Sequence, residues 1–313
     1  MQQKRDLGAS GIAITPLMLG GNVFGFTANE AASFAVLDAY VAEGGNSVDT
    51  ADIYSSWAPG HVGGESETVL GKWFAQGGGR RDSVVLCTKV GMWDKRLGLG
   101  RQNILDACDD SLRRLQTDVI DLYQLHRDDE TTAPEVFIGA LKDLVQAGKV
   151  RALGLSNFKP ARLEVAIAEA KRQGVSIATL QPEYNLMNRE IEAEITPICV
   201  RESVSLIPFY GLANGYLTGK YRTEADKAKS VRGGRMDKYM QGKGPAVLAA
   251  LDAVSARLGA TPAQVALAWI MAKPAIAAPI ASATSAEQVR ELMGALRLDL
   301  SADDVSALDR ASA

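Results

Sequence analysis

Short apolar runs alternate with stretches of helical spacing along almost the whole chain. Eight of these runs are rich in branched aliphatic residues and have the length of buried strands. They begin at Thr15, Asn46, Val84, Val119, Val150, Ala178, Val204 and Ala275. The stretches between them carry apolar residues three and four positions apart, as at Phe34, Leu37 and Val41, which predicts amphipathic helices.

Strands separated by helices predict parallel neighbours, because a parallel pair needs a long crossover connection. Eight such units without a Pro/Gly-rich linker favour a closed (β/α)8 barrel, or TIM barrel, over an open doubly wound sheet. We therefore expect residues 1–313 to form a single α/β domain. The segment KRDLGASGIAI (residues 4–14) precedes the first strand and predicts a β-hairpin that closes the bottom of the barrel.

Local signals mark two of the helix starts. Thr261 and Pro262 predict an N-cap followed by the first helical position. Ser285 and Gln288 have the S-x-x-Q form of a capping box. The polar, basic stretch of residues 220–244 after the seventh strand shows no apolar period and is predicted to be irregular.

Composition excludes several classes of protein. Of the 313 residues, 47% are hydrophobic and 23% charged, which is typical of a globular chain. A net charge of −3 gives no electrostatic reason to expect nucleic acid or an anionic membrane as a partner. No apolar run reaches the ~18 residues of a membrane span, and no signal-peptide core stands near the N-terminus. Three cysteines without CxxC spacing predict no disulfide framework, so we expect a cytoplasmic protein.

The common motifs for metal and nucleotide binding are absent from the sequence. The two histidines, His61 and His126, belong to no HExxH or Cys/His cluster, so we expect no metal site. His61 is expected to face solvent. Neither GxGxxG after a strand nor GxxxxGK[ST] occurs, so a bound nucleotide would be held in some other way.

Polar residues stand where several predicted strands end. Asp49 ends the second strand and Tyr54 follows in the loop, while Lys89 ends the third strand and His126 the fourth. Taken singly, each has a structural interpretation as a helix cap, a solvent-facing cation or a packed side chain. A barrel brings neighbouring strand ends to one mouth, so we expect the four side chains to lie together. Asp52 is expected only to order the loop or cap a helix.

These four side chains suit one kind of chemistry. A phenol has a pKa of ~10, and a neighbouring ammonium is expected to lower the pKa of Tyr54. Asp49 would keep Lys89 charged, and His126 would donate to a carbonyl oxygen and orient it. The arrangement protonates a carbonyl oxygen but offers no nucleophile for its carbon, so a hydride donor would complete the reaction.

At this point the chain resembles the aldo-keto reductase superfamily over essentially its whole length, and most of all its longer bacterial members. Those members are also similar to the β subunits of voltage-gated potassium channels. The resemblance rests on segments that occur in the family's order: DTADIY with GGESETVLGKW, CTKVG, SLRRLQTDVIDLYQLH, GKVRALGLSNF, LQPEYN and GYLTGKY.

The resemblance implies a (β/α)8 barrel that binds NADPH or NADH without a Rossmann domain. It implies a catalytic tetrad of Asp49, Tyr54, Lys89 and His126, in which Tyr54 is the general acid in reduction and the base in oxidation. It further implies cofactor contacts at Gly21, Asn22, Ser156, Asn157, Gln181, Phe209, Tyr210, Gly211, Leu212, Gly215, Leu217, Lys220, Ser282, Thr284 and Gln288. Trp57 and Trp93, in the loops after the second and third strands, are candidate walls of the substrate pocket; core packing is the alternative.

The same resemblance favours NADP(H) over NAD(H), with two departures. Ser282 and Gln288 stand where many relatives carry a cation near the adenosine 2′-phosphate, and Leu292 replaces a usual asparagine. Arg232 or Arg235, in the basic stretch, is a candidate replacement cation; a solvated loop is the alternative.

The expected function is NAD(P)H-dependent reduction of small aldehydes and ketones. An NAD-dependent sugar or pyridoxal-type dehydrogenase is one alternative, a slow redox-sensing regulatory subunit a second, and a phosphate-binding lyase or isomerase on the same barrel a third.

Overall fold

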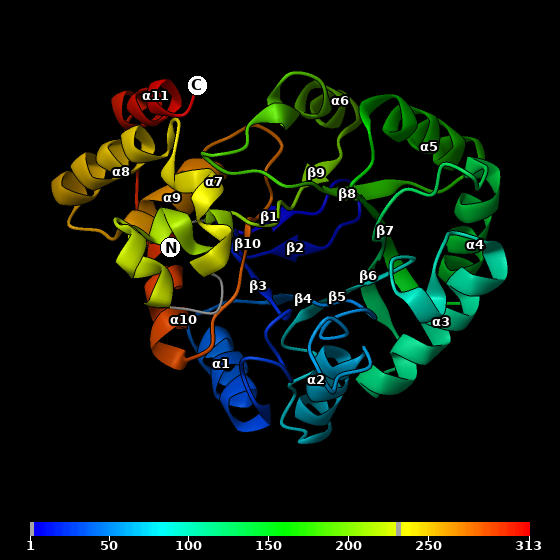
Figure 1. Ribbon diagram of the computed structural model, residues 1–313. Coiled ribbons are helices and arrows are strands. Elements are labelled where there is room, and N and C mark those ends of the chain that lie inside the picture. The colour runs from blue at the N-terminus through cyan, green and yellow to red at the C-terminus, as the bar shows by residue number, and fades with distance from the viewer. Residues whose placement is uncertain (1–2, 230–232) are drawn as a thin grey trace.

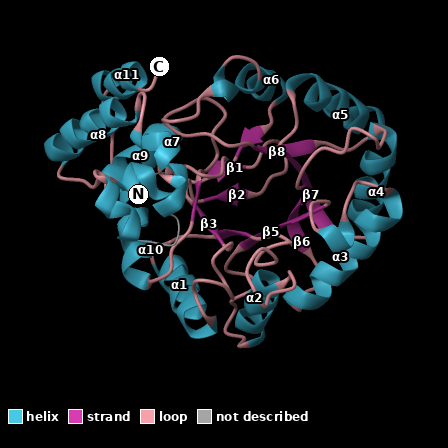
Figure 2. Cartoon of the chain, viewed as in Figure 1, coloured by secondary structure: helices cyan, strands magenta, loops and turns pink. Residues whose placement is uncertain are grey.

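The computed structural model describes residues 3–229 and 233–313 of the chain. Eight parallel strands surround the centre of the molecule, and helices lie outside them (Figures 1 and 2). The strands are β3 (Met18–Gly20), β4 (Ser47–Asp49), β5 (Val85–Val90), β6 (Ile120–Leu125), β7 (Val150–Ser156), β8 (Ile177–Gln181), β9 (Ser205–Leu206) and β10 (Ile280–Ala281). Each falls within or beside one of the eight apolar runs of the sequence.

Hydrogen bonds close this sheet into a barrel. The strand order is β10-β3-β4-β5-β6-β7-β8-β9, with every neighbouring pair parallel. At the seam, Leu206 N donates to Ala275 O (2.7 Å) and Ile280 N donates to Pro208 O (2.8 Å). The predicted (β/α)8 barrel is therefore confirmed.

Helices cover the outer face of the strands. Those that follow successive strands are α1 (Glu30–Ala42), α2 (Glu65–Ala75), α3 (Arg101–Leu115), α4 (Pro134–Gln146), α5 (Pro160–Arg172), α6 (Ile195–Glu202), α9 (Pro262–Met271) and α10 (Ala286–Met293). Three more helices, α7 (Asp237–Met240), α8 (Gly244–Leu258) and α11 (Ala302–Ala311), were not predicted. Helix α8 packs against both α9 and α11, outside the barrel wall (Figure 1).

Short 3-10 turns interrupt the longer connections. They are η1 (Asp94–Arg96), η2 (Glu190–Glu192), η3 (Ala213–Thr218), η4 (Glu224–Lys229), η5 (Gly233–Arg235) and η6 (Gly294–Arg297). Turns η4 and η5 lie in the basic stretch that was predicted to be irregular. Among the described residues, no helix has the length and apolar character needed to cross a membrane.

The two predicted helix starts differ in outcome. Thr261 caps α9 in a full capping box with Gln264, and Pro262 takes the first turn, as predicted. At α10, Ser285 Oγ accepts from Gln288 N (3.3 Å), but the Gln288 side chain accepts from Thr284 N (2.8 Å) instead of the cap residue. The reciprocal half of the predicted second box is therefore wrong, because Thr284 offers a closer donor.

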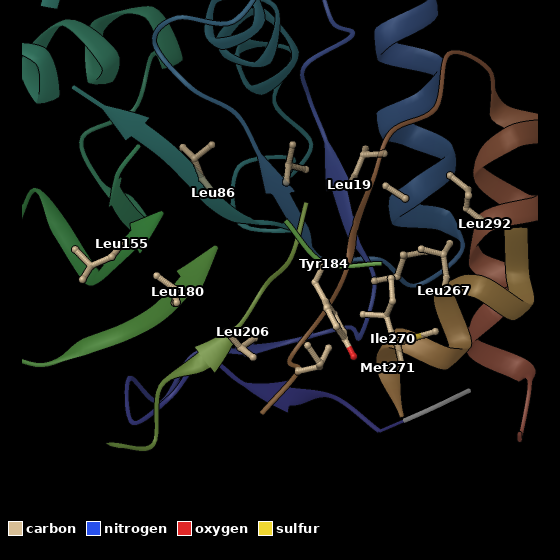
Figure 3. Close-up of a cluster of buried hydrophobic side chains, with 14 of the residues drawn as sticks. Leu19, Leu86, Leu155, Leu180, Tyr184, Leu206, Leu267, Ile270, Met271 and Leu292 are labelled. Atoms are coloured by element: carbon tan, nitrogen blue, oxygen red, sulfur yellow. The ribbon is translucent and has the colours of Figure 1, made fainter. Parts of the chain in front are cut away.

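The apolar core has two parts, one on each side of the strands. The larger part lies between strands and helices, where Leu19, Leu86, Leu155 and Leu180 meet the helical layer (Figure 3). The smaller part lies inside the barrel and comprises Leu7, Ile12, Ile14, Met18, Cys87, Leu122, Ala152, Ala178, Ile207, Ala277, Ala278 and Ile280.

The N-terminal hairpin supplies the first three residues of that inner core. Strands β1 (Arg5–Asp6) and β2 (Ala13–Ile14) pair antiparallel. Gly8 N donates to Ser205 Oγ (2.8 Å) at the start of β9, and Arg5 Nη1 donates to Ile276 O (2.8 Å). Both contacts lie at the amino ends of the barrel strands, so the predicted hairpin at the bottom of the barrel is confirmed.

Candidate active site

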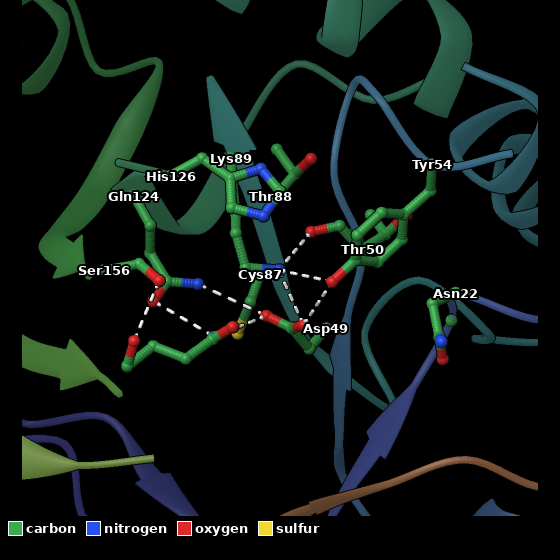
Figure 4. Close-up of polar contacts among 12 residues, drawn as sticks. Asn22, Asp49, Thr50, Tyr54, Cys87, Thr88, Lys89, Gln124, His126 and Ser156 are labelled. Atoms are coloured by element: carbon green, nitrogen blue, oxygen red, sulfur yellow. Dashed lines mark hydrogen bonds and ion pairs between the residues drawn. The ribbon is translucent and has the colours of Figure 1, made fainter. Parts of the chain in front are cut away.

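Asp49, Lys89 and Tyr54 meet at the carboxyl ends of two neighbouring strands (Figure 4). Asp49 is the last residue of β4, and Lys89 lies near the end of β5. Lys89 Nζ lies 2.6 Å from Asp49 Oδ2, 3.0 Å from the Tyr54 hydroxyl and 2.9 Å from Thr50 O. These acceptors match the three N–H groups of an ammonium, which explains how a fully buried lysine is accommodated.

Tyr54 connects this ion pair to His126. The Tyr54 hydroxyl accepts from Lys89 and donates to Asp49 Oδ2 over 3.3 Å. His126 follows β6 directly, and its ring packs edge-to-face on Tyr54 with 6.0 Å between centroids. His126 Nδ1 is buried and has no hydrogen-bond partner within the described part of the chain. The structure thus brings all four predicted residues together.

Two glutamine amides bind the second carboxyl oxygen of Asp49, Oδ1. Gln124 Nε2 and Gln181 Nε2 donate to Asp49 Oδ1 over 3.3 and 3.0 Å. Gly154 leaves room for them, because a Cβ there would lie 2.8 Å from Gln124 Cγ. Sequence reasoning missed Gln124 and Gly154. The signal for Gln124 was its place two residues before His126, on the same face of the strand.

Burial dominates the electrostatics of this cluster. Burial alone would lower the pKa of Lys89. The neighbouring Asp49 and Tyr54 have the larger combined effect, so the pKa of Lys89 is raised. Burial also raises the pKa of Tyr54 to about 12, although Lys89 acts in the opposite direction. The expectation that Lys89 would lower the pKa of Tyr54 overall is therefore wrong, because desolvation of the phenolate is the larger effect. Burial and then Lys89 hold the pKa of His126 well below its usual value, so its imidazole is neutral.

Asp52 caps no helix of the described chain, contrary to one of its two expected roles, and its backbone N–H donates to Lys89 O (3.3 Å). Its side chain is fully buried, and neither carboxyl oxygen has a hydrogen-bond partner within the described residues. Burial, followed by the charge of Glu67, raises the pKa of Asp52 to about 8. Glu67 itself accepts from Thr88 Oγ1 (2.5 Å) and Arg114 Nε (2.7 Å). Asp52 is therefore a mostly protonated carboxyl at neutral pH.

Comparison with known proteins gives this site its context. Residues 16–313 match the aldo/keto reductase family. The chain belongs to that family. It is 36% identical over 305 residues to the uncharacterized oxidoreductase YrpG of Bacillus subtilis, covering 94% of this chain and 91% of that protein. It is 32% identical over 328 residues to protein tas of Escherichia coli, with coverage of 96% and 94%. Norsolorinic acid reductase B of Aspergillus parasiticus is 32% identical over 326 residues, with coverage of 97% and 82%.

Membership places the protein among the NAD(P)-dependent oxidoreductases that act on small-molecule carbonyl compounds. Three residues predicted to contact the cofactor lie together at the carboxyl ends of β7 and β8. Ser156 Oγ donates to Gln181 O (2.8 Å), and Asn157, with φ of 56°, donates to Ser156 Oγ (3.0 Å) and His126 O (3.1 Å). A hydroxyl and two amides beside the tetrad match the donors and acceptors of a carboxamide.

An aromatic pair follows β9 at the same rim. Phe209 is held by its backbone, since its N–H donates to Pro182 O (3.0 Å) and its ring is half-buried. Tyr210 has φ of 54°, is 40% exposed, and packs edge-to-face on Phe209 with 4.9 Å between centroids. The half-buried ring of Phe209 suits stacking on a planar cofactor ring better than the exposed Tyr210 does.

The next predicted cofactor segment is a tight turn. It contains Gly211, Leu212, Gly215, Leu217 and Lys220 around η3. Gly215 has φ of 97°, which favours glycine. Leu217 is fully buried in the apolar core, so its side chain serves packing. Lys220 is exposed, and its Nζ lies 3.7 Å from where a Cβ on Gly215 would stand, so this cation folds back over the turn.

The last predicted segment connects the loops after β3 and β10. Ser282 Oγ donates to Asn22 Oδ1 over 2.5 Å, and Gly21 N donates to Asp49 O over 2.8 Å. The Gln288 side chain accepts from both the N–H and the hydroxyl of Thr284. These contacts join the segment to the rim of the mouth, but they supply no cation.

The two predicted substrate walls have different surroundings. Trp57 is 51% exposed and packs on Tyr54, with 5.9 Å between ring centroids. Trp93 lies against Gly63, where a Cβ would meet its ring at 2.7 Å, and Arg114 stacks on its face. Trp57 therefore borders the tetrad directly, whereas Trp93 supports the neighbouring loop. Sequence reasoning missed Phe26, which is 40% exposed and contacts Trp57 edge-to-face.

Proposed function

We propose that this enzyme reduces aldehydes and ketones to alcohols, with Tyr54 as the general acid. The observation that carries the proposal is the Tyr54 hydroxyl, held between the Lys89 ammonium and the Asp49 carboxylate beside a neutral His126. A proton donor, a cation that stabilises the resulting phenolate and a donor for the carbonyl oxygen then lie in one place.

Bound NAD(P)H supplies the hydride to the carbonyl carbon. His126 orients the carbonyl oxygen toward the Tyr54 hydroxyl, which delivers its proton as negative charge develops on that oxygen. Lys89 stays protonated and stabilises the Tyr54 phenolate, while Asp49 keeps the ammonium in place. Ser156, Asn157 and Gln181 would hold the carboxamide of the cofactor, and Phe209 would pack on its nicotinamide ring.

Reduction is the favoured direction. A pKa of about 12 keeps Tyr54 protonated at neutral pH, which is the form that reduction requires. Oxidation requires the phenolate, which this buried site disfavours at neutral pH. The name of norsolorinic acid reductase B assigns that relative the same direction.

The proposal is tested by the Tyr54→Phe variant. Removal of the hydroxyl should lower kcat by roughly 10²–10⁴, the range for loss of a general acid. Cofactor binding, followed by quenching of NADPH fluorescence, should stay within about twofold, a difference below ~0.5 kcal/mol. Tyr123→Phe is the matched control, because its buried hydroxyl lies near Ile104 O, away from the tetrad. A Tyr54→Phe enzyme that keeps most of its rate would overturn the assigned mechanism.

NADP(H) is the proposed cofactor, in preference to NAD(H). Support comes from Lys220 and Arg235, both exposed and both without a carboxylate partner within residues 3–229 and 233–313. Three other cations of the basic stretch, Arg222, Lys227 and Lys229, are already paired with carboxylates. Lys238 lies over the Tyr239 ring, and Lys243 Nζ donates to Ser312 O (2.7 Å). Arg232 lies outside the described residues. Ser282 and Gln288 are uncharged where many relatives carry a cation, which supports the second candidate, an NAD-dependent dehydrogenase of sugars or pyridoxal-type alcohols.

A further inference from the structure

His61 joins two loops at the mouth of the barrel. It stands in the loop between β4 and α2, and its Nε2 lies 2.8 Å from Gly25 O in the loop between β3 and α1. Its Nδ1 lies 3.3 Å from Pro59 O in its own loop. The ring is half-buried, not solvent-facing as expected from the sequence. Both ring nitrogens therefore face backbone carbonyl oxygens.

Those two partners make the contact sensitive to protonation. A carbonyl oxygen only accepts hydrogen bonds, and a neutral imidazole carries only one N–H. The neutral ring can donate to Gly25 O or to Pro59 O, and its other nitrogen then presents a lone pair to an oxygen. The imidazolium donates to both. Protonation of His61 thus adds a second bond and removes a repulsive contact.

The same ring supports an aromatic wall beside Tyr54. Phe26, the residue after Gly25, packs edge-to-face on His61 and on Trp57, with centroid separations of 6.1 and 6.3 Å. Trp57 in turn packs on Tyr54 at 5.9 Å. Both wall residues are large, apolar and substantially exposed, at 40% and 51%. The wall is built from two loops, and His61 hydrogen-bonds across them.

We propose that His61 is a positioning residue that holds Phe26 and Trp57 as one wall of the substrate site. The inference rests on the proposed function, since the wall acts only if the carbonyl substrate binds at Tyr54. A fixed aromatic wall favours carbonyl compounds with a flat apolar group next to the reacting carbon. A loosened wall weakens their binding and leaves proton transfer from Tyr54 intact.

Few other charges surround His61 on the elements packed against it. In its own loop and the start of α2, Glu65 accepts from Val62 N (2.7 Å) and Gly63 N (2.9 Å). On α1 and α2, Glu30 pairs with Lys72 (2.6 Å), and on α2 and α3, Glu67 pairs with Arg114 (2.7 Å). These groups are engaged with one another or with backbone, so the printed contacts of the His61 ring nitrogens are with carbonyl oxygens and not with a charged side chain.

Ring nitrogen NMR tests the contact itself, without any substrate. The chain has only two histidines, so a His61→Gln variant assigns both sets of ring signals. In the neutral ring the proton should lie on Nε2, which has the shorter contact with a carbonyl oxygen. A neutral ring with mixed tautomers would overturn the inference.

Steady-state kinetics test the consequence for substrate choice. In His61→Ala, KM for benzaldehyde should rise about fivefold or more, while kcat and KM for propanal stay within about twofold. His61→Gln, which keeps one donor, should recover part of the loss.

Propanal serves as the internal reference because it shares Tyr54 and the cofactor but lacks a ring. Val165→Ala, which shortens an exposed apolar side chain on α5, is the control variant. An unchanged aldehyde ratio in His61→Ala would overturn the inference even if Tyr54→Phe abolished turnover. Retained turnover in Tyr54→Phe would instead contradict the proposed mechanism alone.

Discussion

Asp52 lowers the free energy of unfolding by an amount that depends on pH. Its pKa is raised to about 8 by burial and by Glu67, from an ordinary value of 3.8. Between these values the unfolded chain has released this proton and the folded chain has kept it, so stability falls as pH rises. The loss of stability reaches its full size above the pKa of Asp52 in the folded protein. It disappears below the pKa of Asp52 in the unfolded chain.

The Asp52→Asn variant should remove this dependence. An amide does not ionise, so the stability of the variant relative to wild type should increase by a few kcal/mol between about pH 5 and pH 8. Urea denaturation at both pH values measures the change. Asp94→Asn, at an exposed position in η1, should follow the wild-type curve. Equal pH slopes for Asp52→Asn and wild type would show that Asp52 is ionised in the folded state.

For single residues, the sequence predicted which side chains form the site better than it predicted how deeply they are buried and what they contact. Asp49, Tyr54, Lys89 and His126 were identified because each stands at or beyond a strand end, a position that is readable from the apolar period. The raised pKa of Tyr54 was not foreseen, since it depends on how deeply the barrel and its loops bury the phenol. Distances between ring systems on separate loops are equally invisible in a single sequence, so Phe26 was missed.

Elements were predicted well where one face packs on the barrel. The eight strands follow from apolar runs, and α1, α3 and α4 follow from the helical spacing of their apolar residues. Helices α8 and α11 were not predicted, since we expected one helix for each strand and these two pack mainly on other helices. The turns η3 to η5 carry few periodic apolar residues, so sequence gives their composition but not their path.

We propose that Lys220 and Arg235, in the segment from η3 to η5, decide the choice of cofactor. If Lys220 and Arg235 meet the phosphates, Lys220→Ala should weaken both cofactors, because both contain the pyrophosphate. Arg235→Ala should raise the Kd for NADPH about tenfold and that for NADH less than twofold, because only NADPH carries the 2′-phosphate. Fluorescence titration measures each Kd.

Arg222→Ala is the matched control for these variants. Its guanidinium is already committed to Asp252, so its loss should leave both Kd values within about twofold of wild type. Equal affinity of the wild type for NADPH and NADH would contradict the preference for NADP(H). It would favour the NAD-dependent dehydrogenase, whose segment around Ser282 and Gln288 needs no cation.

The molecule as a whole separates stability from chemistry at opposite ends of one barrel. The hairpin residues Leu7, Ile12 and Ile14 close the amino ends of the strands with an apolar layer. Asp49, Lys89, Gln124 and Gln181 form a polar layer at the carboxyl ends. Such a division lets loops at the mouth vary without cost to the core.

Leu7→Ala tests this division. Leu7 is fully buried in the inner core, so its truncation should cost about 2–5 kcal/mol of unfolding free energy. KM and kcat should stay near wild type under native conditions, because the tetrad lies at the other end of the strands. Val165→Ala, which truncates an exposed side chain, should shift the urea midpoint little.

If residues 1–313 form one domain, as we propose, unfolding should also be a single transition by both fluorescence and circular dichroism. A first transition that removes the hairpin and leaves the barrel folded would contradict that view, because a plug that shares the barrel core must unfold with it.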